Sequence, residues 1–293
     1  MKPTPHLHHP AARLSAGLLL AGFAGLGLSC GGAPVLASAA LEIGRNLLST
    51  TTKNYTGEYS QQVEEVLNSI VVEPVEGQVA GLANPAPAAS LSAQARPLAL
   101  DVSVMKEISR GDQAVPTPIS DGEVLRDGGA DPRGGDNFKI QIRPAQKCYV
   151  YVVSVDGTGW AQPLFPSSFS RVSNPVSAGQ EIVLPGGSEW FYLDQYKGVE
   201  TTWFLVSRTP RPDLEARMRA LAGRTRPAFP PDQQVASVKK PAVVERGIAG
   251  TRPSRVPASV VSSAGLTYDV TPTTFSADSV QADLVLTRWF RHE

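Results

Sequence analysis

The sequence predicts a mainly β protein, either an antiparallel β-sandwich or a partly open barrel, with an N-terminal helical segment and a short helix after its aromatic-rich part. Runs rich in aromatic and β-branched residues recur at about 8–12-residue spacing, as in sandwiches and barrels. Clusters of Gly, Pro, Asp and Asn separate these runs. Long helical patterns do not alternate with them, which disfavours a parallel α/β sheet.

The first residues, 1–29, predict a secretory signal peptide. Lys2 and Arg13 precede an apolar run over residues 14–28, and small residues follow it. A positive start, a short apolar run and small residues are typical of export signals, whereas a membrane span needs about 20 apolar residues. We therefore expect the chain to be exported.

The end of this run, GLSC, resembles the bacterial lipobox, with Gly27 at the position where leucine is usual. The resemblance implies cleavage before Cys30, lipidation of Cys30 and attachment to the membrane through that lipid. Gly31 follows the cysteine, and within the resemblance this favours the outer membrane. Two alternatives remain open: cleavage near Ala39 in the Ala-Ser-Ala sequence, giving a secreted or periplasmic protein, and an uncut anchor.

Two segments are predicted between the signal and the β domain. Residues 30–73 are predicted to form a lipid-anchored helical segment, because apolar residues between Leu41 and Ile70 recur at spacings of three and four. Such a helix is either a stalk that binds partners or oligomerises, or a helix packed on the main domain. Residues 74–97 are rich in Pro, Ala, Gly and Ser, which predicts a linker.

The rest of the chain, 98–293, is predicted to form the β domain. Alternation over residues 98–104 and 138–142 predicts two strands, and the run CYVYVVSV is apolar on both faces, as in a central strand. Further strands are predicted at WAQPLFP and AGQEIVLP, and in the C-terminal part, 256–290, at ASVVSS, GLTYDV and ADLVLTRW. Asp213 to Leu221 predicts a short helix, and the basic, proline-rich residues 224–255 predict an irregular surface loop.

The stretch Glu189–Arg208 holds the best core candidates of the chain. It reads EWFYLDQYKGVETTWFLVSR, two aromatic runs separated by a short polar interval. This pattern predicts the central hairpin of the sandwich, with residues 194–198 as its turn.

The order of motifs resembles that of the bacterial domain of unknown function catalogued as family 4384 (DUF4384). The phrases DGEVLRDG, GDNFKIQIRP, CYVYVVSVDGTG, PLFPSS, NPVSAGQEIVLP, EWFYLDQYKGVET and TWFLVSR carry the resemblance, over about residues 98–222. It implies a β-rich domain of the kind found on envelope lipoproteins and appended to peptidases and kinases. It assigns no catalytic residue, and the DGGADPRGGDNF stretch is longer than the turn usual in the family.

Composition and motifs disfavour several function classes. Lys plus Arg and Asp plus Glu each number 27, and a signal would remove only Lys2 and Arg13, so no basic surface for nucleic acid is expected. Removal of the signal leaves one cysteine, Cys148, read as a small buried core residue, and one histidine, His292, expected at a frayed end. Catalysis by Ser-His-Asp or Cys-His and His-rich metal sites are therefore disfavoured. Without a phosphate-binding motif, no cofactor is predicted.

A calcium site is an alternative to the prediction of no metal. Asp127, Asp131, Asp136 and Asn137 crowd a glycine-rich loop, and oxygen ligands suit calcium. The spacing does not match the EF-hand, and turn chemistry explains these residues without an ion.

Five residues around the predicted turn are candidates for contact with a ligand or partner: Tyr192, Asp194, Tyr196, Lys197 and Glu200. We expect a non-enzymatic outer-membrane lipoprotein whose β-sandwich binds another envelope protein or assembles with itself. One alternative is a module that binds peptidoglycan or glycan through exposed aromatic residues at 192–203. Another alternative is a hydrolase that uses Asp194 and Glu200 as paired carboxylates.

Overall fold

The computed structural model describes residues 57–71, 96–111, 113–129, 131–227 and 248–293. The predicted signal peptide, Cys30, the alternative cleavage site near Ala39 and almost all of the predicted linker lie outside the described residues. Within them the protein is mainly β, with two α-helices and open sheets rather than a closed barrel. All strand pairs are antiparallel except one, between β3 (Val124–Leu125) and β14 (Leu284–His292).

The described strands form two large sheets and a hairpin. The seven-stranded sheet contains β1 (Ala99–Arg110), β2 (Gln113–Pro118), β4 (Asn137–Pro144), β7 (Ile182–Leu184), β8 (Phe191–Tyr192), β10 (Ile248–Pro253) and β13 (Thr273–Ala277). The five-stranded sheet has the order β3-β14-β9-β5-β6, with β5 at Tyr149–Val155, β6 at Ala161–Phe165 and β9 at Gly198–Ser207. The separate hairpin pairs β11 (Ala258–Val261) with β12 (Thr267–Val270), and the helices are α2 (Gly57–Val71), the short 3-10 helix η1 (Pro132–Gly134) and α3 (Pro212–Ala222).

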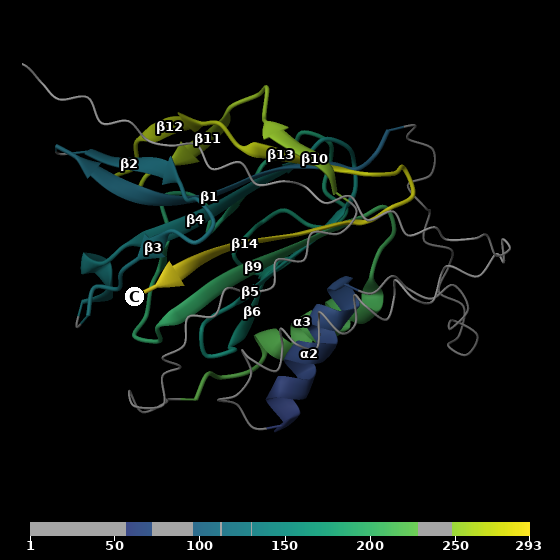
Figure 1. Ribbon diagram of the computed structural model, residues 1–293, viewed down its shortest axis with the longest axis horizontal. Coiled ribbons are helices and arrows are strands. Elements are labelled where there is room, and N and C mark those ends of the chain that lie inside the picture. The colour runs from purple at the N-terminus through teal and green to yellow at the C-terminus, as the bar shows by residue number, and fades with distance from the viewer. Residues whose placement is uncertain (1–56, 72–95, 112, 130, 228–247) are drawn as a thin grey trace, which may run out of the picture.

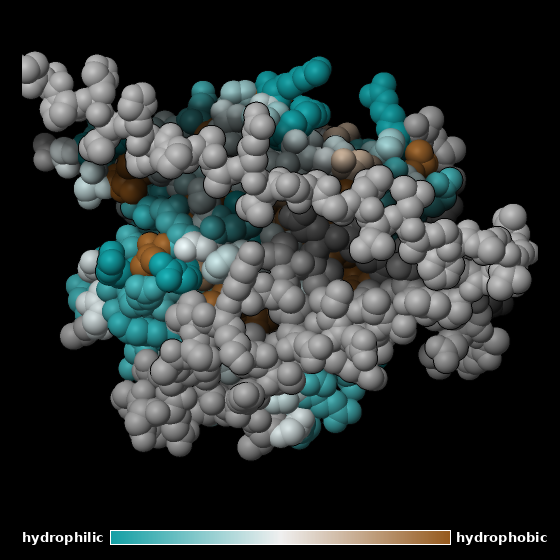
Figure 2. Space-filling view, in the orientation of Figure 1, coloured by the Kyte–Doolittle hydropathy of each residue, from teal (hydrophilic) through white to brown (hydrophobic). Residues whose placement is uncertain are grey.

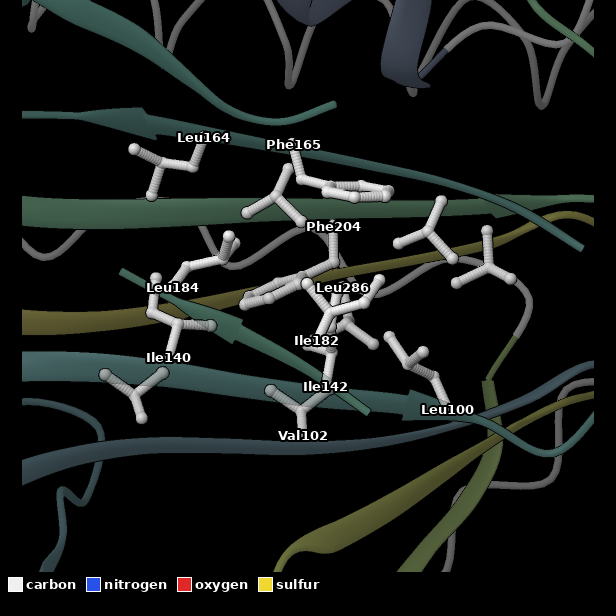
Figure 3. Packing of buried hydrophobic residues seen from close by; sticks show 14 of the residues in the cluster. Leu100, Val102, Ile140, Ile142, Leu164, Phe165, Ile182, Leu184, Phe204 and Leu286 are labelled. Atoms are coloured by element: carbon white, nitrogen blue, oxygen red, sulfur yellow. The ribbon is translucent and has the colours of Figure 1, made fainter. Parts of the chain in front are cut away.

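The two large sheets pack face to face around the main core, as a β-sandwich does (Figures 1 and 3). Ile140 and Ile142 of β4 point from the seven-stranded sheet toward Phe204 and Leu286 of the five-stranded sheet, and all four are fully buried. Alternate residues of a strand lie on one face, so the alternation in the sequence already identified this side of β4. The predicted fold class is confirmed.

The five-stranded sheet is buried on both faces. Val152 of β5 points into the sandwich core, whereas its neighbours Tyr151 and Val153 point to the other face, where they pack with Trp203. Helices α2 and α3 cover this outer face, as Figure 1 shows. Burial on two sides explains why β5 and β9 are almost continuous apolar runs.

Helix α2 is packed on the domain rather than standing away from it. Tyr59, Val63, Val66, Leu67 and Ile70 recur at helical spacing and are buried against the sheet. The Tyr59 hydroxyl donates to the backbone oxygen of Ala161, at 3.0 Å, and accepts from the Ala161 N–H, at 2.8 Å. Of the two interpretations of the helical segment, residues 57–71 support the packed helix.

The outer face of the seven-stranded sheet carries a buried polar layer under the β11–β12 hairpin. Lys139, Gln141 and Arg143 alternate with the core residues of β4 and are all less than 10% exposed. The Lys139 ammonium donates to the backbone oxygens of Gly187, at 2.7 Å, and Val261, at 3.0 Å. Burial lowers the pKa of Lys139 to about 8, although two nearby glutamates oppose this shift.

Arg143 joins this sheet to the chain segment that leads into β11. Its guanidinium contacts the Asp101 carboxylate at 2.7 Å and Glu181 at 3.0 Å. It also donates to the backbone oxygens of Val256, at 2.5 Å, and Pro257, at 2.9 Å. The buried charge is therefore paired and hydrogen-bonded, which is the condition for tolerating it in an interior.

The predicted central hairpin is wrong. Strand β8 pairs with β4 in the seven-stranded sheet, whereas β9 pairs with β5 and β14 in the five-stranded sheet. Residues 193–197 thus cross from one layer to the other instead of making a hairpin turn. Both aromatic runs need burial, and a sandwich meets that need by placing them in opposite sheets.

The remaining predicted helices and strands are confirmed in most cases. Helix α3 and the C-terminal strands β11, β12 and β14 are confirmed. The predicted irregular loop, 224–255, is wrong at its C-terminal end, where β10 adds to the sheet edge beside β13. Strands β2, β10 and β13 were not predicted; β2 and β10 contain prolines or glycine, which are depleted in strands, and β13 is only five residues long. No described helix has the length and apolar character needed to cross a membrane.

Candidate functional site

Two turns in contact build the candidate site. The first turn follows β5 and contains Asp156 and Gly157. The second is the bend of the crossing segment 193–197, which leads into β9 at Gly198. A Cβ atom added to Gly157 would lie 2.5 Å from the Gly198 Cα, closer than any real side chain lies. Only glycines allow this approach, and it brings the acidic residues of the two turns together.

A cavity of about 110 Å3 lies beside the two turns. Its acidic lining comes from Asp156, Asp194 and Glu200, and its aromatic lining includes Trp160, Phe191 and Tyr192. The carboxylates come from the five-stranded sheet side and the crossing segment, and Phe191 comes from the seven-stranded sheet. The cavity is therefore a concave, acidic and aromatic site between the two layers.

The guanidinium of Arg226 occupies the acidic side of this cavity. It forms ion pairs with both Asp156 and Asp194 and lies 3.2 Å from the Thr158 hydroxyl oxygen. Its central carbon lies 3.9 Å from the centre of the Tyr196 ring, a cation-π contact. Arg226 was not among the predicted site residues, because it lies in the basic segment after α3 that was predicted to be an irregular surface loop.

The Asp156 carboxylate is held in place by its own turn. One oxygen, Oδ1, accepts hydrogen bonds from the N–H of Thr158 at 2.8 Å, from the Thr158 hydroxyl at 2.6 Å and from the N–H of Trp160 at 3.0 Å. The other oxygen, Oδ2, makes the ion pair with Arg226. Burial raises the pKa of Asp156, and the Arg226 guanidinium opposes this shift.

A second set of titratable side chains lies next to the cavity: His292 is placed between the carboxylates of Glu200 and Asp127. Its Nδ1 is 3.5 Å from the Glu200 Oε1, and its Nε2 is 3.6 Å from the Asp127 Oδ2. The expectation of a frayed His292 is wrong: the residue is 1% exposed. Strand β14 continues to His292, opposite Gly198 of β9, and pairs with β3 on its other side.

The pKa values of this pair are both raised. Burial raises the pKa of Glu200 to about 7, with His292 opposing the shift and the charges of Asp156 and Asp194 adding to it. Burial alone would lower the pKa of His292, but Glu200, Asp194 and Asp127 raise it above its usual value. Both groups therefore hold their protons more tightly in the folded protein than in the unfolded chain.

The pair should make the protein less stable as the pH rises. Between the usual glutamate pKa and about 7 the folded state retains a proton on Glu200 that the unfolded chain has lost, so the free energy of unfolding falls across this window. For His292 the loss continues as the pH rises through its raised pKa. Urea unfolding of the wild type and of Glu200→Gln from pH 5 to pH 8 checks this prediction, and the variant should show a flatter pH dependence. Equal slopes would contradict it.

The predicted contact residues divide into outward and inward groups. The Tyr192 side chain is 41% exposed, and Asp194 and Lys197 are about half exposed. Tyr196 is 7% exposed and packs under Arg226, and Glu200 faces His292. The outward group, Tyr192, Asp194 and Lys197, is called the rim below.

The four calcium candidates do not converge. Asp127 accepts from the N–H of Gly129 and Asp131 from that of Arg133, both two residues later, whereas Asp136 accepts from the N–H of Arg126, ten residues earlier. Asn137 instead donates to the Glu107 carboxylate, at 2.8 Å. The described residues contain no group of three or more acidic, histidine or cysteine side chains arranged to hold a metal ion.

Two further features do not add to the site. Cys148 is buried and is not in a disulfide. Burial raises the pKa of its thiol to about 12, which fits a core residue rather than a nucleophile. A larger groove of about 290 Å3 lies between β6, the loop after it and α3, lined by residues such as Pro166, Phe169 and Met218. It does not contain the acidic and basic groups of the first cavity.

Comparisons with known proteins bear on the domain alone. Neither the curated proteins nor the solved structures gave a match to this chain. Residues 133–210 match the family model described as a domain of unknown function, DUF4384. The match is narrower than the predicted 98–222, and it includes Asp156, Asp194 and Glu200 but neither Arg226 nor His292. Residues 133–210 of this chain are therefore similar to the DUF4384 domain.

Proposed function

We propose that the protein is a non-enzymatic, lipid-anchored interaction module of the bacterial outer membrane. Its rim, Tyr192, Asp194 and Lys197, contacts another envelope protein or a second copy of the chain. The observation that carries this proposal is the exposed Tyr192 ring beside charged side chains at the mouth of a cavity. Aromatic residues with charged neighbours are typical of the energetically important part of protein interfaces.

Few large hydrophobic side chains are exposed on the described part of the protein. Among the described residues, the exposed large hydrophobic side chains are Tyr192, Val256 and Leu266. In the view of Figure 2, hydrophobic residues form only small separate spots on the coloured surface. A small contact surface with one aromatic anchor fits a reversible interaction better than a permanent apolar interface.

The charges of the cavity support binding rather than hydrolysis. A glycosidase needs two carboxylates that flank a bond, with space for the sugar between them. Here Arg226 lies between Asp156 and Asp194, and Glu200 faces His292. The chain's own Arg226 thus lies between two carboxylates where a substrate would need to sit, and the hydrolase remains the weaker alternative.

The glycan alternative has lost most of its aromatic surface. Tyr196 and Trp203 are buried, at 7% and 3% exposure, so Tyr192 is left as the exposed ring of the predicted group. Sugar sites stack their ligands on exposed aromatic faces. Sedimentation with purified sacculi separates the two proposals, because the interaction module predicts no enrichment of the protein in the pellet.

The anchor is tested independently of the rim. Labelling cells with palmitate should mark the wild type and should not mark Cys30→Ala, because Cys30 is the proposed lipid acceptor. Persistent labelling of the variant, or secretion of an unlabelled wild type cut near Ala39, would refute the anchor.

The interaction is tested by photo-cross-linking in cells. A photoreactive amino acid at Lys197 should give a defined cross-linked product, and adding Tyr192→Ala should weaken it roughly tenfold, as expected for an aromatic anchor. The matched control places the same amino acid at Leu266, which is similarly exposed, at 46%, on the β11–β12 hairpin. Equal products at both positions, or no product together with a monomer by light scattering, would count against the proposal.

A further inference from the structure

The acidic side of the cavity has the chemistry of a receptor for one guanidinium group. A guanidinium is planar, carries donors along its edges and stacks on aromatic faces. Arg226 meets a different carboxylate with each of its terminal nitrogens, Asp194 through Nη1 and Asp156 through Nη2. The Tyr196 ring lies against its flat face, at 3.9 Å.

The receptor groups are oriented without help from Arg226. The Asp156 Oδ1 is fixed by the donors of Thr158 and Trp160, and the Asp194 Oδ1 accepts the N–H of Tyr196 at 2.8 Å. In both residues the second oxygen, Oδ2, is the one that faces the cation. The site is therefore preorganised by the two turns, which reduces the cost of binding.

The site also favours a cation. The Asp156 side chain is 12% exposed, and no hydrogen bond from the described residues reaches its Oδ2. A buried ionised carboxylate without a cation is unfavourable, so after removal of Arg226 this group would either take up a proton or accept another positive group. This burial distinguishes the site from an ordinary cluster of exposed acidic residues.

The ion pairs of Arg226 in the cavity are made by its side chain, and its backbone is not part of a β-strand. It follows α3, which ends at Ala222, in a segment that is neither helix nor strand. Its side chain can leave the cavity without breaking backbone pairing of either sheet. The part of the cavity next to the Arg226 side chain is lined by Leu164 and Phe191. This lining suits an apolar side chain that neighbours the arginine in the sequence of the partner.

We propose that the cavity formed by Asp156, Asp194 and Tyr196 is a receptor for an arginine side chain of a partner protein, which displaces Arg226 from it. This proposal rests on the interaction function proposed above and names the chemistry of the partner. Lysine is a poor substitute, because one compact ammonium neither bridges two carboxylates nor stacks in the same way. Arg226 then competes with the partner's arginine for the same cavity, which lowers the affinity of the protein for that partner.

Binding of N-acetyl-arginine methylamide to the full chain tests the proposal, with the lysine counterpart as the matched probe. The variant Arg226→Ala should bind the arginine probe about tenfold more tightly than the wild type does. The same variant should bind the arginine probe about tenfold more tightly than the lysine probe. Adding Asp194→Asn to this variant should remove the gain. A folded Arg226→Ala that does not prefer arginine would overturn the proposal.

A second variant covers a failure of Arg226→Ala to fold. Arg226→Lys keeps the charge but not the planar fork, so it should fold and bind the arginine probe more tightly than the wild type does. If both variants unfold, Arg226 is a structural clamp and the proposal is wrong. Cross-linking through Lys197 separates the two proposals, with Asp156→Asn as the variant because Asp156 belongs to the receptor but not to the rim. A cross-linked product that Asp156→Asn leaves unchanged refutes the arginine receptor alone. If the arginine probe binds selectively but Lys197 gives no cross-linked product, the interaction function is refuted.

Discussion

Replacing Arg143 with methionine should lower the free energy of unfolding by about 3–5 kcal/mol, the usual cost of removing one partner of a buried ion pair. The Arg143 and Asp101 side chains are 10% and 14% exposed, so the remaining carboxylate has little access to water. The variant also loses the donors to Val256 and Pro257 that hold the segment before β11. Urea unfolding measures the loss, and hydrogen exchange should report faster exchange in the β11–β12 hairpin.

The control for this experiment is the same replacement at Arg219. That side chain is 72% exposed and lies 4.0 Å from Glu215, so Arg219→Met should change stability by less than about 0.5 kcal/mol. A double variant, Arg143→Met with Asp101→Asn, should regain part of the loss because the uncompensated charge is gone. A loss below about 1 kcal/mol in Arg143→Met would show that the Asp101 carboxylate is solvated after all.

Truncating Phe204 to alanine should cost about 3–5 kcal/mol, because the change removes a large side chain and leaves a cavity. Phe204 is fully buried in the sandwich core, where its strand neighbours are Val152 and Leu286. The surrounding strands are paired on both sides of β9, which limits how far the site can collapse around the cavity. Thermal and urea unfolding of the variant measure the loss.

Tyr192→Ala provides the comparison within the same stretch of sequence. Tyr192 belongs to the other aromatic run and is 41% exposed, so its loss should cost about 0.5 kcal/mol or less. If Tyr192→Ala cost as much as Phe204→Ala, the exposed position of the Tyr192 side chain would be contradicted. A stable Tyr192→Ala is also what the cross-linking experiment needs.

The strand pattern of the sandwich could be predicted, but the pairing of strands could not. Alternation in β1 and β4 and the two-sided apolar run of β5 follow from which faces are buried, and this information is local. The partner of β8 depends on contacts across more than 50 residues, between Phe191 and Phe138. A short turn between two aromatic runs indicated a hairpin because nothing in the sequence marks residues 193–197 as a crossing.

The burial of the polar residues of β4 was not predicted either. Lys139, Gln141 and Arg143 have the pattern of a solvent-exposed face, yet the β11–β12 hairpin, more than a hundred residues later, covers them. Pattern alone does not distinguish a solvated polar face from one that a third layer pairs and buries.

The candidate site was predicted in part. Asp194, Tyr196 and Glu200 were singled out from their sequence neighbourhood, and they do lie at the cavity or beside it. Asp156 was seen only as a turn residue, although the Asp-Gly-Thr-Gly pattern was the available signal. Arg226 and His292 reach the site from 32 and 92 residues after Asp194 and Glu200, and no local pattern announces such contacts.

The crossing segment 193–197 has a mechanical consequence. It connects β8 in one sheet directly to β9 in the other, so sliding of the two sheets would strain these few residues, as it would the short connection from β4 to β5. The same segment carries Asp194 and Tyr196, which grip the cation. A bound guanidinium also touches Asp156 beyond β5, and so it acts as a brace across the joint. Occupancy of the cavity is thereby coupled to relative movement of the two sheets through one of the short connections that join them.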